Sequence, residues 1–205
     1  MGFNGEIEVL PSWVAVQRRP SLYLGQLRSL EATESYVLGA GCIALFCCDL
    51  QEVRLYAGEG WFEIEFHGDP AVLLSRARPD DAELLAEVIL SVLYACADAH
   101  GVAEAHRDSL CRDGATLAVV NALAHELVLE LRTETETWRH RRVDGAAVVP
   151  LSRTGAGGEP GGRFRVRPGS EYIDGGVGPL SIGLRRIERE LLRLKPDLRV
   201  SLVAM

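Results

Sequence analysis

The sequence lacks the features that most directly place a chain in a membrane, disulfide-rich or nucleic-acid-binding class. No apolar run reaches the roughly 18 residues that a membrane-spanning helix needs. The five cysteines are odd in number and have no C-x-x-C spacing, so we expect neither a disulfide framework nor a zinc site. Acidic residues outnumber basic ones by 29 to 22, and the net charge of −7 disfavours general binding to nucleic acid.

What remains is the composition of a soluble globular protein. The 205 residues suffice for one domain with a sizeable core, and 47% hydrophobic with 25% charged residues is the usual balance. Residues 2–8 carry two glutamates and no basic residue, unlike the start of a signal peptide. We therefore expect a cytoplasmic protein with mostly buried cysteines, and we expect no metal ion, no cofactor and no membrane association.

The pattern of apolar residues predicts helices that are separated from strands along the chain. Ser12 is expected to cap the first helix, and alternation on both sides of residues 57–60 predicts a β-hairpin. The expected helices cover residues 12–19, 31–48, 80–99, 115–125 and 180–194, the expected strands cover residues 53–56, 61–66, 127–132, 137–143, 163–167 and 198–203, and residues 154–162 are expected to form a loop. This order predicts an α+β fold, a mixed sheet with helices on one face.

Short segments spread over the chain carry a family resemblance. The run Arg19-Pro20-Ser21-Leu22-Tyr23-Leu24-Gly25 is similar to R-P-x-M-Y-I-G, Val119-Val120-Asn121-Ala122-Leu123 reads V-V-N-A-L, and Gly161–Pro168 is similar to G-T-x-v-x-F-x-P. In this order they resemble the ATPase domain of the DNA gyrase B subunit family, which has the GHKL fold. The resemblance implies a two-layer α/β sandwich in a single domain over residues 1–205, without the gyrase transducer or topoisomerase domains.

The resemblance also implies where the catalytic residues of such an ATPase would lie. The family motif E-x-x-x-N places a glutamate that activates water and an asparagine that holds magnesium on the second helix. These positions fall near Gly39 and Ile43, and the motif E-x-x-x-N occurs nowhere in this chain. Glycine has no side chain and isoleucine cannot bind a metal, so the resemblance predicts a chain that does not hydrolyse ATP.

The contacts that hold the nucleotide in the family are replaced as well. Phe66 stands where an aspartate would bind adenine, Gly162 stands where a threonine is expected, and Asp69 is expected to form a turn. Of the glycine-rich phosphate lid only Gly114 remains, preceded by Asp113, which we expect to cap the next helix. A carboxylate about 4 Å from a phosphate charge would cost on the order of 4 kcal/mol near a protein surface.

The altered pocket implied by these replacements has two possible states. It would be lined by Cys42, Ile43, Phe46, Phe66, His67 and Tyr94. Either these side chains fill it as packed core, or a small apolar ligand binds there with His67 as its polar anchor. In the second case His67 is also the candidate general acid or base of a derived enzyme.

Arginines form a second feature with two interpretations. Arg163, Arg165 and Arg167 alternate, so they share one face of a strand, and residues 139–142 bring further basic side chains nearby. Together they form either a basic patch for an acidic partner or a phosphate, or the solvated face of the sheet, balanced by glutamates.

The sequence thus predicts an inactive GHKL-type domain that serves as a protein-interaction or regulatory module. It would act as a homodimer or with a protein partner. The alternative is a small-molecule binding protein or biosynthetic enzyme that uses the pocket around Phe66 and His67. A nucleotide binder with unusual contacts is a third hypothesis.

Overall fold

The computed structural model describes residues 10–77, 82–93 and 115–204. A seven-stranded sheet has the order β5-β4-β3-β6-β2-β1-β7. Its strands are β1 (Cys48–Gly58), β2 (Trp61–Asp69), β3 (Ala124–Arg132), β4 (Glu136–Val143), β5 (Ala146–Ala156), β6 (Gly161–Pro168) and β7 (Arg199–Ala204). Only the β1–β7 pairing is parallel, so the sheet is mixed, as predicted.

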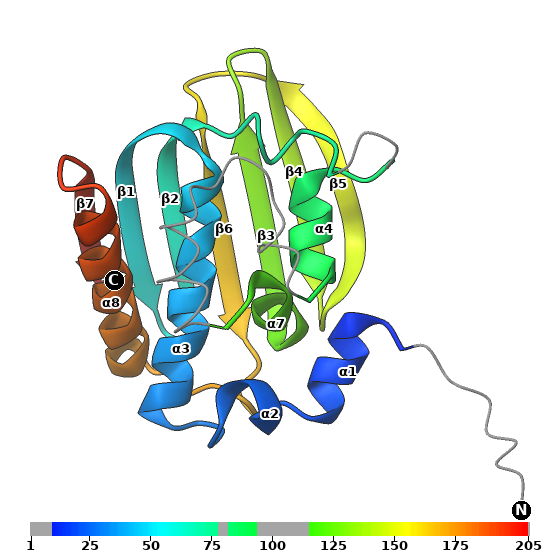
Figure 1. Ribbon diagram of the computed structural model, residues 1–205, viewed down its shortest axis with the longest axis vertical. Helices are drawn as coiled ribbons and strands as arrows, with labels where there is room; N and C mark the ends of the chain where they lie inside the picture. The colour runs from blue at the N-terminus through cyan, green and yellow to red at the C-terminus, as the bar shows by residue number, and fades with distance from the viewer. Residues whose placement is uncertain (1–9, 78–81, 94–114, 205) are drawn as a thin grey trace, which may run out of the picture.

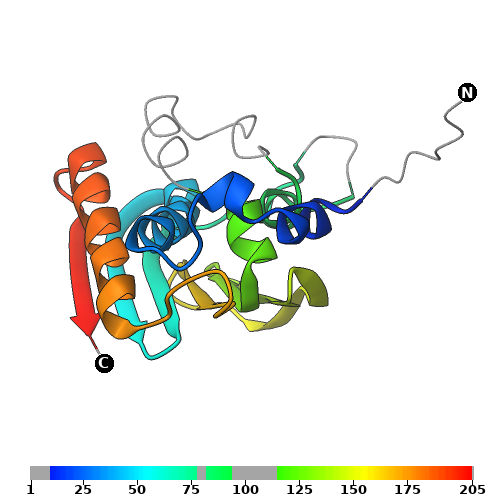
Figure 2. The ribbon, with the colours of Figure 1, turned by 90° about the horizontal axis from the view of Figure 1, so that it is seen from below.

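The helices cover one face of this sheet and leave the other face open (Figure 1, Figure 2). They are α1 (Ser12–Arg18), α2 (Ser21–Leu24), α3 (Leu30–Gly41), α4 (Leu85–Ser91), α7 (Leu117–Ala122) and α8 (Val177–Leu194), and a 3₁₀ helix, Cys42–Phe46, follows α3 directly. The predicted α+β layering is confirmed. Within the described residues, none of the helices combines the length and hydrophobicity needed to span a bilayer.

Helix α3 is central in the helical layer. Ser29 caps it by accepting a hydrogen bond from the N–H of Ala32, and most of the following residues are buried. The ring of Tyr36 meets Phe62 of β2 edge to face, and its hydroxyl donates to the carbonyl oxygen of Val120 in α7 at 2.8 Å. One buried tyrosine therefore joins α3 to the sheet and to α7.

Helix α8 lies beside α3 and is amphipathic. Its buried residues Leu180, Leu184, Ile187 and Leu191 recur at helical spacing. Gly183 faces Val37 of α3, and a Cβ at this glycine would come within 2.7 Å of the valine side chain. The glycine thus permits the two helices to pack closely.

Several predicted boundaries are wrong. The single helix expected over 31–48 ends at Gly41 and becomes the 3₁₀ helix, and β1 already begins at Cys48. The helix expected over 115–125 is only Leu117–Ala122, and the described part of the one expected over 80–99 contains only Leu85–Ser91. Residue Ser12 is the first helical residue of α1 and not its cap, because Pro11 holds that position.

Strand β5 was not predicted and forms one edge of the sheet. It pairs with β4 through an irregular register, and it includes part of the loop expected over 154–162. Val148 is 53% exposed and Pro150 has no N–H to donate. The next N–H, that of Leu151, donates to a carboxylate oxygen of Glu87 in α4 at 3.2 Å.

Candidate functional site

The helix face around Gly39 has no room for a catalytic side chain. Gly39 lies on α3 and is buried, and a Cβ added there would overlap the carbonyl oxygen of Ala115. The N–H of Ala115 donates to the carbonyl of Ser35 at 3.0 Å, which fixes this backbone against α3. The chain that enters α7 therefore occupies the space in which a longer side chain would have to lie.

The other expected pocket residues of this region belong to the hydrophobic core. Ile43 is fully buried in the 3₁₀ helix, and Cys42 and Phe46 are almost fully buried. These three side chains pack with the sheet and the neighbouring helices.

Phe66 and Gly162 form a cross-strand pair between β2 and β6. Both positions face the helices, Phe66 is fully buried, and a Cβ at Gly162 would overlap the phenyl ring. The absence of a side chain at position 162 thus makes the space that the ring of Phe66 fills. The two replacements inferred separately from the sequence are one packing arrangement.

His67 lies on the opposite face of the sheet from Phe66, because successive strand residues point to opposite sides. Its Nδ1 is 3.4 Å from a carboxylate oxygen of the exposed Glu159. Its Nε2 is buried and has no hydrogen-bond partner among the described residues. The structure therefore does not bring His67 together with Ile43 and Phe66.

Two further expected pocket residues, Tyr94 and Asp113, lie outside the described residues. The cap of α7 is Thr116, whose hydroxyl accepts from the N–H of Val119 at 3.4 Å. Asp113 is therefore not the capping residue that the sequence led us to expect.

Two aspartates stabilise turns by accepting hydrogen bonds from nearby backbone N–H groups. A carboxylate oxygen of Asp69 accepts from the N–H of Ala71, as expected for a turn. The run Asp174–Gly178 fits the adenine-binding pattern D-x-G-x-G in letters, but Asp174 accepts from the N–H of Gly176. The carbonyl of Gly175 in that run accepts from Gly60, at the opposite end of β2 from Asp69. The run Asp174–Gly178 is therefore a turn that lies away from Phe66.

Charged residues of opposite sign alternate across the open face of the sheet. Glu130 of β3 lies in register between Arg139 of β4 and Arg163 of β6. On the other side of Arg163, the order continues with Glu65 of β2 and Arg54 of β1. Opposite charges on neighbouring strands stabilise their pairing modestly. The arginines identified in the sequence are thus interspersed with glutamates on the solvated face.

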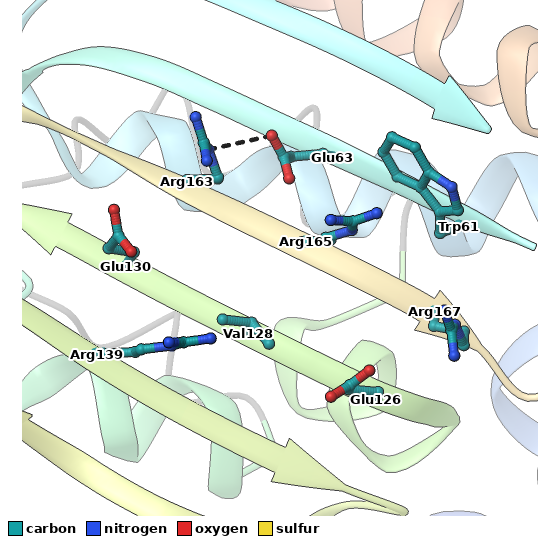
Figure 3. Close-up of a pocket in the computed structure, with 9 residues that line it drawn as sticks. All are labelled: Trp61, Glu63, Glu126, Val128, Glu130, Arg139, Arg163, Arg165 and Arg167. Atoms are coloured by element: carbon teal, nitrogen blue, oxygen red, sulfur yellow. Dashed lines mark ion pairs between the residues drawn. The ribbon is translucent and has the colours of Figure 1, made fainter. Parts of the chain in front are cut away.

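A groove of about 350 Å³ is hollowed in this face (Figure 3). We call it the open-face groove, and it is lined by Trp61, Glu63, Glu126, Val128, Glu130, Arg139, Arg163, Arg165 and Arg167. The guanidinium of Arg165 lies 4.1 Å from the centre of the Trp61 ring, a cation–π contact. Burial raises the pKa of the Glu63 carboxyl, and the charges of Arg163 and Arg165 oppose this shift.

Comparison with known proteins identifies the fold. No protein-family model and no curated protein matches the sequence. The structure is similar to the ATP-binding domain of topoisomerase IV from Francisella tularensis, solved in complex with a small-molecule inhibitor, with a TM-score of 0.68. The match covers 97% of this chain and 93% of that one. The fold is that of a GHKL ATP-binding domain. At 17% identity the likeness establishes the fold alone.

This GHKL-type fold contains a buried polar cluster that sequence reasoning missed. His140 and Arg142 of β4 point under the helices, and Arg142 donates to Ser91 at 2.8 Å and to the carbonyl oxygen of Gly145. Burial first, and then the Arg142 charge, hold the pKa of His140 below its ordinary value of 6.5. Alternation along residues 139–142 was the signal that two of these four basic residues point inward.

Proposed function

We propose that this chain is a single GHKL-type domain of the cytoplasm that does not hydrolyse ATP and serves as a protein-interaction or regulatory module. The observation that carries the proposal is the contact at Gly39. The position that the resemblance gives to the catalytic glutamate is a glycine packed against the Ala115 backbone. Without a carboxylate there, the domain has no group at this position to orient and deprotonate water.

The packing at the cross-strand pair supports the same proposal. The Phe66 ring fills the space above Gly162, and Ile43 is fully buried where a magnesium ligand would be needed. The burial of both side chains also argues against the alternative, a small apolar ligand bound beside them. His67 would not anchor such a ligand, since it lies on the other face of the sheet.

The nucleotide part of the proposal is tested by titration calorimetry with ATP and ADP in magnesium, together with a phosphate-release assay. An active GHKL ATPase measured in parallel serves as the control. We expect no phosphate release above buffer and no binding in the submillimolar range. Submillimolar affinity, or turnover by the purified chain, would contradict the proposal.

The interaction part is tested by the size of the protein in solution and by affinity capture. Light scattering after gel filtration separates a monomer from a homodimer over a range of concentrations, and cross-linking to captured proteins identifies other partners. A monomer that yields no reproducible partner would count against an interaction module. The measurement is independent of the nucleotide titrations.

A further inference from the structure

The open-face groove retains positive charge that the described residues do not neutralise. Arg163 pairs with Glu63 at 3.2 Å and with Glu65 at 3.5 Å. In the same groove, Glu126 pairs with Arg141 of β4 at 2.8 Å. These pairings use part of the charge that lines the groove.

The remaining arginines are available to a ligand. Among the described residues, Arg139, Arg165 and Arg167 have no carboxylate within ion-pairing distance, and of the glutamates that line the groove Glu130 also has none. Counted over the whole lining, four arginines face three glutamates, an excess of one positive charge. This local excess is positive in a chain whose net charge is −7.

The shape of the groove follows from one short side chain among long ones. Val128 lies between Arg165 of β6 and Arg141 of β4 and forms the floor (Figure 3). Arg165 is held against Trp61, and a guanidinium stacked on a ring keeps its N–H groups free at its edge. The groove therefore combines an apolar floor with preoriented donors, which suits carboxylates.

We propose that the open-face groove binds a carboxylate-rich segment of a protein partner, an inference that rests on the proposed interaction function. The groove crosses β4, β3, β6 and β2, a span of roughly 14 Å at the usual strand spacing, which about four or five extended residues cover. Carboxylates of the segment pair with Arg139, Arg165 and Arg167. A donor or a basic residue of the segment faces Glu130.

The glutamates in the groove favour a peptide over nucleic acid. Glu63, Glu126 and Glu130 lie between the arginines and repel a continuous row of phosphates. A peptide can place its carboxylates at separate positions, which matches this alternating pattern. The same reasoning predicts that binding weakens as salt rises, because the charges are exposed.

The test is fluorescence anisotropy with a labelled peptide of alternating glutamate and serine, compared with glutamine–serine and lysine–serine peptides and with single-stranded oligothymidine. We expect the full-length chain to bind the glutamate peptide best. Arg139→Gln and Arg167→Gln should each weaken that binding roughly two- to fivefold, the range of exposed ion pairs. Glu130→Gln should strengthen it by a similar factor.

Arg189→Gln is the matched control, because it removes the same charge from an exposed position on α8 in the helical layer. It should leave peptide binding unchanged, and melting curves should show that all variants remain folded. Absence of salt-sensitive peptide binding up to millimolar concentration, equal loss with Arg189→Gln, or tighter binding of oligothymidine would overturn the inference. Nucleotide titration of the same variants distinguishes a failure of the peptide-binding inference from a failure of the proposed function.

Discussion

At the scale of single residues, Gly39 is the described glycine at which an added Cβ would meet the closest neighbouring atom. Gly39→Ala should lower the free energy of unfolding by about 2–3 kcal/mol, because the added methyl group must displace the Ala115 backbone. Urea denaturation measures the change. Gly178→Ala is the control, since nothing lies within 4 Å of a Cβ there, and it should stabilise α8 by about 0.5–1 kcal/mol. A neutral Gly39→Ala would refute the close packing of α3 against Ala115.

His140 makes stability depend on pH. Its pKa is lowered in the folded state, first by burial and then by Arg142, so the unfolded chain binds a proton more readily. Stability should therefore fall as pH drops below the ordinary value of 6.5, towards the lowered pKa of the folded state. Denaturation at a series of pH values should show a smaller fall for His140→Gln. The His125→Gln variant, which changes an exposed ring, should show the same fall in the free energy of unfolding as the wild type.

The residues of the candidate site were only partly predictable. The sequence identified Gly39 and Phe66 as replacements, and it assigned Asp69 to a turn, which the structure confirms. It could not say which face of β2 the helices cover, and so it grouped His67 with Phe66. Alternation predicts that two neighbours point apart, but only packing decides which of them is buried.

At the scale of elements, Asn121 joins three parts of the fold. Its amide donates to the carbonyl of Leu90 in α4 at 2.9 Å and to that of Gly145 in the β4–β5 turn at 3.0 Å. Asn121→Ala should cost about 2 kcal/mol, because buried hydrogen bonds are lost without water to replace them. Thr116→Ala, which removes only the α7 cap, should cost about 1 kcal/mol. Similar losses for both variants in denaturation would contradict the joining role of Asn121.

Element types with strong periodicity were predictable, whereas the ends of elements depended on distant residues. Helix α8 follows its pattern of leucines, but the apolar run after Gly41 fits a helix equally well. It gives way to β1 because Cys48 pairs with Asp69, a contact that local sequence does not reveal. Strand β5 escaped prediction since Pro150 and Gly155 resemble loop residues, and its pairing with β4 outweighs that tendency.

At the scale of the whole molecule, the two faces of the sheet have different roles. The face under the helices is apolar and packed, and the opposite face carries the alternating arginines and glutamates and the open-face groove. The separation of helices and strands along the chain was enough to predict this layering. The groove itself was not predictable, because it depends on the register of four strands.

The packed helix face leads to a prediction for the intact protein. Magnesium and ATP at about one millimolar should leave the melting temperature unchanged in a thermal-shift assay. A ligand present at about 100 times its dissociation constant would add about 2.7 kcal/mol, which such an assay detects readily. A reproducible upward shift with ATP, absent with inorganic phosphate, would contradict the filled site around Phe66.

The edge formed by β5 affects the tendency of the protein to aggregate at high concentration. An incoming strand that tried to extend the sheet would find no N–H at Pro150 and a Leu151 N–H already satisfied by Glu87. Without this protection, the exposed Val148 beside them would favour aggregation through this edge. Pro150 and Glu87 thus protect this edge from pairing with a strand of another molecule. We expect Pro150→Val to shorten the lag before amyloid dye fluorescence appears.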